Sequence, residues 1–388
     1  MCSDLLFEPS LTTPEMAEAV SDRAWLNALL SFEAALAQAE SKVGLISESH
    51  AARIAAACNP ELFDPRLIGR EAVASANPVV PLVDELRRAV GPDAAPAVHR
   101  GATSQDAMDT AMMLVARDGL DLILAGLSAL AARCADLAKR HRSDPMAGRT
   151  LLRRALPISF GLKSANWMIG VLEARGPLAA LRENRLAVQL GGPVGTLEAF
   201  DERGFEVTVL LARNLGLAVP EVPWHTTRNR VAELVTGLAI AAGSAVKISN
   251  DLLLLSQDEV AEVAAANPGR SSSMPAKRNL VQAVEARVAF AGAAAQAGML
   301  IGLWPGEHER AAGSWQAEWT AVSQAFRFTA GAVDRTVQAL TGLHVDVAQM
   351  RKNIPTPSGE IPDVGASEAL VDRALGIYSR QIDRREGS

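Results

Sequence analysis

Cysteine, tyrosine and long apolar runs are scarce in this sequence of 388 residues, which contains three cysteines and one tyrosine. The cysteines, Cys2, Cys58 and Cys134, are scattered and form no CxxC pair or His/Cys cluster, so neither a disulfide framework nor a zinc site is expected. The longest apolar stretches are far shorter than a membrane span. The amino-terminal segment also lacks the apolar core of a signal peptide. These absences predict a cytoplasmic protein with free thiols.

A surplus of positive charge is missing as well, because 38 Lys and Arg residues stand against 44 Asp and Glu residues, a net charge of −6. This balance argues against a nucleic-acid partner and against a polybasic membrane surface. The densest basic stretch, residues 139–142, is typical of a helix carboxyl terminus, where cations complement the helix dipole.

Long helical periodicity dominates the sequence, and the short alternating runs typical of strands are nearly absent. We therefore predict an all-α fold. The five longest periodic segments run over about residues 114–140, 158–189, 228–265, 281–301 and 314–343.

The segment 228–265 is apolar on more than one face, and a helix of that kind must be buried on nearly all sides. Five helices from one chain cannot bury so much apolar surface, so we expect a bundle shared between the subunits of an obligate oligomer. A monomer with one central helix is the alternative.

Three regions follow from the distribution of helix-breaking residues. Residues 1–105 contain short helices interrupted by several prolines and form an amino-terminal helical domain. Residues 106–343 form the central long-helix domain. Residues 344–388 form a short carboxy-terminal segment with a proline- and glycine-containing loop and a final helix over about 367–384.

A first polar block, residues 99–106, precedes a helix and contains Thr103 and Ser104. A helix amino terminus with added hydroxyl groups suits a carboxylate ligand, although simple capping explains the same residues. A second block, residues 148–154, carries three arginines around a Gly/Thr turn, which can grip a dianion or merely begin a solvated helix.

Two further segments carry weaker signals. The glycine-rich segment 189–196 allows close backbone approach but lacks the lysine of a phosphate-binding loop. In the segment 223–230, His225 and Arg228 are candidates to face a ligand, although a lone histidine is more often structural.

The segment Asn267–Leu280 is small, polar and flexible in its first half, and it places Lys277 and Asn279 at the entrance of the next helix. Serines beside a lysine and a helix amino terminus form a set that can stabilise an oxyanion. A disordered linker is the alternative.

The sequence SSSMPAKRN in this segment resembles the GSSxMPxKxNP signature of the fumarase/aspartase superfamily, and the blocks at 101–111, 148–154 and 191–196 resemble further superfamily blocks in the same order. Within the superfamily, residues 77–82, 223–226, 307–313 and 315–319 resemble the bacterial 3-carboxy-cis,cis-muconate cycloisomerases.

The resemblance implies a homotetramer with a central bundle of twenty helices and active sites that are each built from three subunits. It implies catalytic roles for Ser271, Lys277 and Asn279, with Ser271 moving the proton on carbon, and no metal or cofactor. It implies this substrate-binding set: His99, Thr103, Ser104, Arg149, Thr150, Arg153, His225, Arg228, Ser272 and Met274.

The chain departs from the lyase pattern at positions that bear on the reaction. Leu151 stands where lyases have a histidine, and Val284 stands where they have its glutamate partner, with Glu285 one residue on. Arg153 replaces a family glutamine, Arg270 a glycine and Leu280 a proline.

The missing His–Glu pair favours a lactonisation, because the carboxylate nucleophile belongs to the substrate and no leaving group needs a proton. The predicted reaction converts 3-carboxy-cis,cis-muconate to carboxymuconolactone in protocatechuate catabolism by the β-ketoadipate route. The alternatives are a muconate with a 3-sulfo or other substituent, suggested by Arg153 and Arg270, an adenylosuccinate-type lyase, and an inactive structural homologue.

Overall fold

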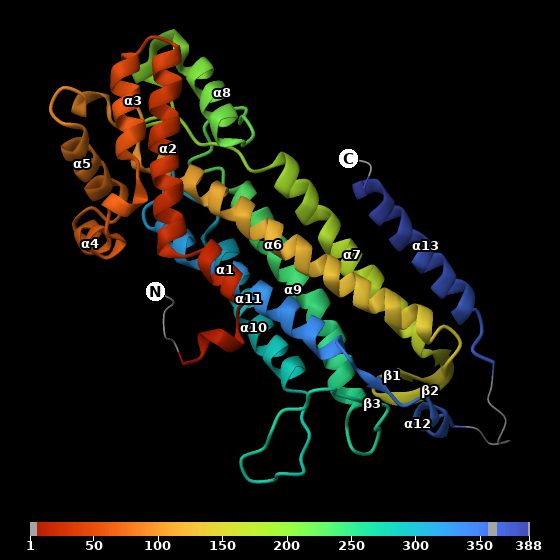
Figure 1. Cartoon of the computed structure of the whole chain (residues 1–388). Helices are drawn as coiled ribbons and strands as arrows, with labels where there is room; N and C mark the ends of the chain where they lie inside the picture. The colour runs from red at the N-terminus through yellow and green to blue at the C-terminus, as the bar shows by residue number, and fades with distance from the viewer. Residues whose placement is uncertain (1–5, 356–362, 387–388) are drawn as a thin grey trace.

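The protein is described by a computed structural model that covers residues 6–355 and 363–386. Five long helices form the body of the molecule and run along one another as a bundle (Figure 1), which confirms the all-α prediction. They are α6 (Ser104–Arg140), α7 (Phe160–Asn184), α9 (Asn229–Leu255), α10 (Val281–Leu303) and α11 (Ser314–Leu340).

The two largest differences from the predicted helix boundaries have local reasons. Helix α6 begins ten residues before position 114, because the Asp106 carboxylate accepts a hydrogen bond from the Thr103 N–H at 3.0 Å and caps the first turn. Helix α9 ends at Leu255 rather than near 265, because the chain turns to form β3 (Val263–Ala264), which pairs antiparallel with β4 (His344–Val345). The predicted cationic terminus is confirmed, since α6 ends at Arg140.

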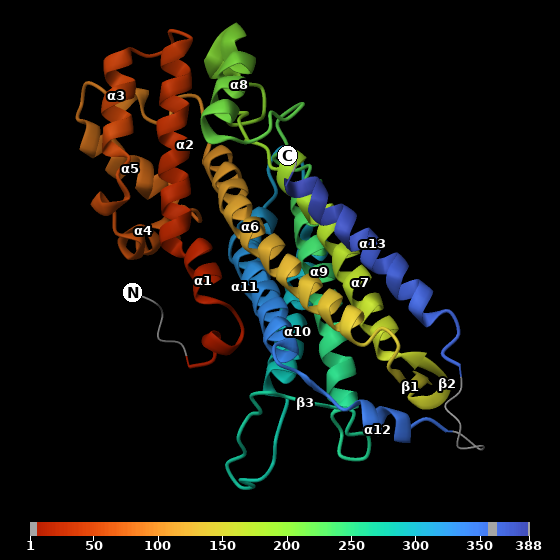
Figure 2. The same cartoon turned by 45° about the vertical axis from the view of Figure 1, so that its right-hand side comes forward.

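Several short helices of the amino-terminal part begin with a proline. Proline is tolerated at the first helical positions because the N–H that it lacks would have no partner inside the helix there. The α-helices are α1 (Pro14–Ala19), α2 (Asp22–Lys42), α3 (Glu48–Ala57), α4 (Pro65–Glu71) and α5 (Val79–Val90). The 3₁₀ turns are η1 (Glu8–Ser10), η2 (Pro60–Leu62), η3 (Ala72–Ala74) and η4 (Ala95–Ala97). Helix α8 (Gly204–Leu215), which follows η5 (Glu198–Arg203), lies beside α2 at this end of the molecule (Figure 2).

Residues 148–154 belong to a β-hairpin, so the expectation of a helix start there is wrong. Strand β1 (Pro145–Thr150) pairs antiparallel with β2 (Arg153–Ser159), and Leu151 and Leu152 form the turn with φ of 49° and 62°. Pro157 disfavours helix in β2 because it lacks an N–H and pushes the preceding residue toward extended backbone. Helix α7 begins immediately afterwards, with the Ser159 hydroxyl accepting from the Leu162 N–H at 3.0 Å.

The final helix is confirmed as α13 (Ser367–Glu386), which follows the short α12 (Val347–Lys352). Helix α13 packs along α7 and α6, and Arg142 holds it through two hydrogen bonds of 2.7 Å to Asp372 and an ion pair with Glu368. The central residues 356–362 of the predicted proline-rich loop lie outside the described residues.

The apolar core runs through the bundle, but α10 is covered on one side only. Helices α9 and α10 are long and apolar enough to cross a membrane by length and composition alone. Half of an apolar 18-residue stretch of α9 is buried inside the chain, compared with 28% of such a stretch of α10. Large apolar side chains of α10 stand exposed in the single chain: Val284, Val288, Met299 and Ile301.

Candidate functional site

The predicted site residues lie in three separate places, which we name by their positions. The carboxylate block is residues 99–106 with the adjoining His225 and Arg228; the arginine hairpin is β1–β2; the serine loop is Gly269–Leu280. Helix α6 joins the first two places, and its 37 residues span about 55 Å at 1.5 Å per residue. The 27 residues of α9 similarly place the serine loop about 40 Å along the bundle from Arg228. One chain therefore does not bring these residues together, and the serine loop projects from the end of the bundle remote from α8 (Figure 1).

Asp106 organises the carboxylate block. Its carboxylate accepts hydrogen bonds from the N–H groups of Thr103 at 3.0 Å and Gly192 at 2.9 Å, and it pairs with Nε2 of His225 at 2.7 Å. Since Asp106 and His225 are buried, three segments distant in sequence meet at this one carboxylate. His225 is thus a structural partner of Asp106 in the single chain.

The glycine-rich segment 189–196 needs glycine where it packs against His225 and Asp106. A Cβ added at Gly191 would lie 2.8 Å from Cε1 of His225, and Gly192 has a φ of 71°. Only glycine fits both the close approach and the left-handed backbone. The segment therefore supports the carboxylate block.

Arg228, which the sequence analysis predicts to bind a substrate carboxylate, forms buried ion pairs within the chain. Its side chain is 4% exposed and donates to Asp109 at 2.7 and 2.9 Å and to Glu318 at 3.0 Å. Burial lowers the pKa of Arg228, but the two carboxylates outweigh burial and raise it, so the guanidinium stays charged. Its N–H groups are committed to protein carboxylates.

Arg310 is a further candidate; it lies in the segment 307–313, which resembles the cycloisomerases, but no motif marks it as a site residue. Its guanidinium donates to the Thr103 hydroxyl at 3.2 Å and to the Pro193 carbonyl at 2.9 Å. Thr103 and Ser104 are half-buried at the start of α6. A partly exposed cation beside two hydroxyl groups and a helix amino terminus suits a carboxylate better than Arg228 does.

In the arginine hairpin, Arg149, which is also a predicted substrate contact, pairs with a carboxylate of the chain. It pairs with the buried Glu262 at 2.6 and 3.0 Å, and Asn353 donates to the same carboxylate at 2.9 Å. Thr150 and Arg153, in contrast, are exposed near the tip of the hairpin. These two residues remain available to a ligand.

The serine loop closes at its base through the hydrogen bond from the Gly269 N–H to the Asn279 carbonyl, 2.8 Å long. The Met274 N–H donates to the Ser271 hydroxyl at 3.1 Å, and the Lys277 N–H donates to the Met274 carbonyl at 3.0 Å. Ser272, Met274 and Lys277 are exposed, whereas Ser271 and Asn279 are half-buried. The loop thus holds Ser271 in a local turn. Lys277 and Asn279 lie just before α10, as the sequence predicted.

Neither position of the lyase His–Glu pair carries a group that transfers protons. Leu151 is 97% exposed at the hairpin turn, and Val284 is 49% exposed on α10. The neighbouring Glu285 is paired with Arg335 at 3.2 Å, so it does not substitute for the missing glutamate.

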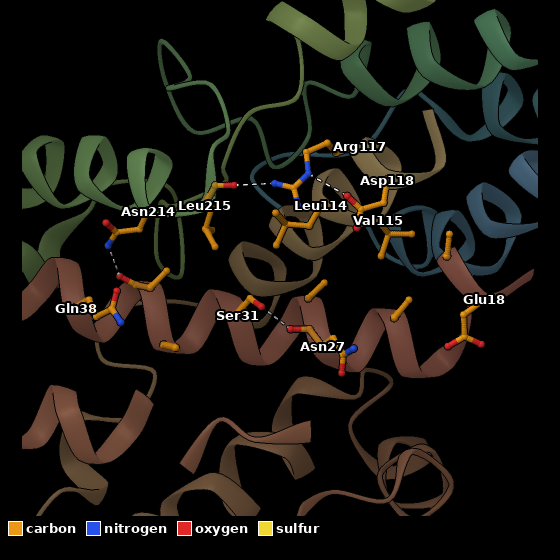
Figure 3. Close-up of a pocket in the computed structure, with 15 residues that line it drawn as sticks. Glu18, Asn27, Ser31, Gln38, Leu114, Val115, Arg117, Asp118, Asn214 and Leu215 are labelled. Carbon is orange, nitrogen blue, oxygen red and sulfur yellow. Dashed lines mark hydrogen bonds and ion pairs between the residues drawn. The ribbon is translucent and has the colours of Figure 1, made fainter. Parts of the chain in front are cut away.

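A polar cleft of about 670 Å³ lies between α2, α6 and α8 and contains none of the predicted site residues. In Figure 3, Arg117 donates to the Leu215 carbonyl and pairs with Asp118, and Asn214 reaches α2. Across residues 6–355 and 363–386, no group of three metal-ligating side chains could hold a metal ion.

Comparisons with known proteins agree with this geometry. A family model described as lyase matches residues 8–295. A 3-carboxy-cis,cis-muconate cycloisomerase of Pseudomonas aeruginosa is 40% identical over 95% of this chain and 82% of its own, and a nitrosuccinate lyase of Streptomyces davaonensis is 42% identical over 92% and 78%. The crystal structure of the 3-carboxy-cis,cis-muconate lactonizing enzyme from Pseudomonas putida matches with a TM-score of 0.90 and 34% identity, over 97% of this chain and 99% of that one.

The fold and the three blocks therefore define a member of the fumarase/aspartase superfamily, as the motifs predicted. The chain belongs to the lyase family of enzymes. Within that family it is similar over nearly its whole length to 3-carboxy-cis,cis-muconate cycloisomerases.

Proposed function

We propose that the protein is a cycloisomerase that converts 3-carboxy-cis,cis-muconate to carboxymuconolactone. Relatives of that name at about 40% identity and a solved lactonizing enzyme at a TM-score of 0.90 support this function. Such a step belongs to aromatic catabolism by the β-ketoadipate route, and we assign the enzyme to the cytoplasm.

The absence of a proton-transferring pair at Leu151 and Val284 carries the proposal. An elimination that releases an amine or hydroxide needs an acid to protonate the leaving group. Lactonisation needs none, because in the reverse direction its leaving group is a carboxylate. An exposed leucine is therefore harmless at that position when the leaving group departs without a proton.

In the proposed mechanism, one carboxylate oxygen of the substrate attacks the distal double bond and forms the ring C–O bond. The electron pair of that double bond moves into the neighbouring carboxylate and gives an enolate-like dianion. The Ser271 hydroxyl then protonates carbon, and the serine regains its proton from solvent. Lys277, Asn279 and the N–H groups of the serine loop stabilise the developing charge.

Assembly into a homotetramer brings the carboxylate block, the arginine hairpin and the serine loop of different subunits together in one active site. The carboxylate block lies about 55 Å from the arginine hairpin along α6 and about 40 Å from the serine loop along α9 of one chain. We assign each active site to three subunits, as the family resemblance implies. The exposed apolar side chains of α10 form the surface that we expect the other subunits to cover.

The remaining parts of the proposal follow the sequence prediction. The reaction uses no metal or cofactor. Residues 1–105, 106–343 and 344–388 form the three regions of each subunit. Ser104, Thr150, Arg153, Ser272 and Met274 are the positions that we keep as substrate contacts, together with His99, Thr103 and the added Arg310.

The direct test is the loss of the ultraviolet absorbance of the muconate diene with purified protein, and Ser271→Ala serves as the inactive control. We expect turnover at nanomolar enzyme and none with the variant. The proposal fails if micromolar tetramer leaves the diene unchanged.

A second candidate is a lyase acting on nitrosuccinate, which the 42% identical relative from Streptomyces davaonensis favours. Its leaving group would be nitrite, a weak base that also departs without a proton. The missing acid–base pair is therefore compatible with both reactions. Formation of fumarate and nitrite from nitrosuccinate, measured beside the muconate assay, separates them by the ratio of kcat/KM.

A further inference from the structure

His99, in the carboxylate block, is held by a carboxylate that the sequence reasoning did not select. Its Nδ1 lies 2.6 Å from Oε1 of Glu33, a residue of α2 that is 66 positions earlier in the chain. The Glu33 side chain is 1% exposed and the His99 side chain 11%. The Phe32 ring also packs against the imidazole, with 6.5 Å between centroids.

The backbone around His99 needs such a restraint. His99 has a φ of 56° and Gly101 a φ of 70°, so the chain passes through two left-handed residues just before Thr103. A left-handed backbone is costly for a residue with a side chain unless its surroundings stabilise it. The Glu33–His99 pair anchors this turn, and the turn sets where Thr103 and Ser104 begin α6.

The other ring nitrogen is open. Within the part of the chain that the structure describes, Nε2 of His99 has no hydrogen-bond partner. A histidine whose Nδ1 is fixed by a carboxylate presents Nε2 in a defined direction. That nitrogen belongs to the same block as the Thr103 hydroxyl, which accepts a hydrogen bond from Arg310.

Several charged groups face this pair. Burial lowers the pKa of His99, but Glu33 and, more weakly, Asp106 on α6 outweigh burial and raise it, while Arg87 on α5 opposes them. On α2, burial raises the pKa of Glu40 to about 8 despite its pairing with Arg100, so this carboxyl is largely neutral at pH 7. Burial raises the pKa of Cys58 on α3 to about 12, so it remains a thiol.

We propose that Glu33 is a positioning residue that holds His99 as a cation, with Nε2–H directed at a carboxylate of the substrate. This inference rests on the proposed function, because it supplies one anion contact for the tricarboxylate. Glu33 itself touches no substrate and acts through His99.

The test is Glu33→Gln, which keeps the shape of the side chain and removes its charge. The pKa of His99 should fall, because burial remains while the favourable carboxylate is lost. A neutral imidazole binds a carboxylate less well, so the alkaline limb of kcat/KM should move to lower pH. At pH 8 we expect kcat/KM to drop about 10- to 100-fold, mostly through KM, as for the loss of one charged hydrogen bond.

Glu40→Gln is the matched control, because it changes a buried carboxyl of the same helix that is largely neutral already. We expect a much smaller movement of its alkaline limb. A uniform loss of activity in Glu33→Gln without movement of that limb would show a merely structural role and overturn the inference.

A second measurement does not depend on the substrate. The His99 signal, identified among the six histidines by its absence in His99→Gln, is titrated by NMR in the wild-type and Glu33→Gln proteins with labelled histidine. A lower pKa in the variant supports the pairing, and an unchanged pKa overturns it. If the muconate proves not to be a substrate, this titration still decides the role of Glu33. If Glu33→Gln does not fold, His99→Gln is measured instead. Its pH profile of kcat/KM should lack the alkaline limb, and a profile that keeps this limb overturns the inference.

Discussion

Arg228 and Arg310 illustrate how residues of one type divide between structure and ligand binding. The buried Arg228 connects Asp109 on α6 with Glu318 on α11, whereas the partly exposed Arg310 donates to the hydroxyl of Thr103. A buried cation between two carboxylates joins the helices, and a cation at the surface of a block is free to meet an anion. Burial separates the two roles, and burial is not visible in a local motif.

The structural role of Arg228 predicts a stability effect. Arg228→Leu leaves Asp109 and Glu318 buried without a counter-charge, so the free energy of unfolding should fall by about 3–5 kcal/mol. Urea unfolding curves with an unchanged slope measure the loss. Arg182→Leu, which breaks an exposed pair with Asp121, should cost about 0–1 kcal/mol. Equal losses in the two variants would contradict the assignment.

Ser271 carries the chemistry in the proposed mechanism, so its replacement should affect the rate alone. Ser271→Ala should lower kcat about 10²- to 10⁴-fold, the usual contribution of one proton-transferring side chain. Thermal unfolding should not change, because the serine loop packs on little. Ser273→Ala, at an exposed position of the same loop, is the control and should retain activity. An active Ser271→Ala enzyme would move the role to another group.

At the level of elements, the long helices could be predicted well and the connections poorly. Long, Ala- and Leu-rich helical segments identify α6, α7, α9, α10 and α11, although the apolar residues of α9 occupy more than one face. The β1–β2 hairpin could not be predicted, because its Leu151–Leu152 turn lacks the Asn or Gly that usually occupies left-handed positions. Tertiary contacts, including the pair between Arg149 and Glu262, stabilise the hairpin instead.

The serine loop depends on a glycine at its base. A Cβ at Gly269 would overlap the Cγ1 atom of Val281, so Gly269→Ala should push the base of the loop apart and displace Ser271. A displacement of about 1 Å commonly costs about 10²-fold in rate. We expect kcat to fall by that order while the helical circular dichroism is unchanged.

Gly69 on α4 supplies the control for this change, since a Cβ there meets nothing within 4 Å and α4 lies outside the apolar surface of α10. Gly69→Ala should keep full activity and gain up to about 1 kcal/mol of stability from helix propensity. Full activity in Gly269→Ala would show that the close approach to Val281 does not position the loop.

At the level of the whole molecule, the exposed apolar face of α10 predicts association. Val288 is 53% exposed in the single chain, and a charge placed there should prevent burial against another subunit. If the wild-type protein is the tetramer that we propose, Val288→Glu should therefore elute with a lower mass than the wild type in light scattering, where one chain contributes 40.9 kDa. Leu370→Glu on α13, where the leucine is 47% exposed, is the control and should remain tetrameric. A wild-type protein of 40.9 kDa would contradict the assembly.

Shared active sites predict complementation between inactive variants. Ser271→Ala damages the serine loop and Thr103→Val damages the carboxylate block, and we assign these two parts of one site to different subunits. Mixed tetramers, formed by unfolding and refolding the two variants together, should contain some sites with both parts intact and regain activity. Each variant refolded alone should stay inactive. A mixture without activity would place both parts in one subunit.

The sequence by itself determined the helical class, the family and the serine loop, because these depend on periodicity and on short motifs whose residues are neighbours in the chain. The family resemblance also implies that Leu151 and Val284 stand where lyases have an acid–base pair. Only the tertiary structure decided which polar residues are free, because Arg228, Arg149 and His225 find their carboxylate partners far away in sequence. It likewise joined Glu33 to His99 across 66 positions, a pairing that depends on how α2 packs and not on any local pattern.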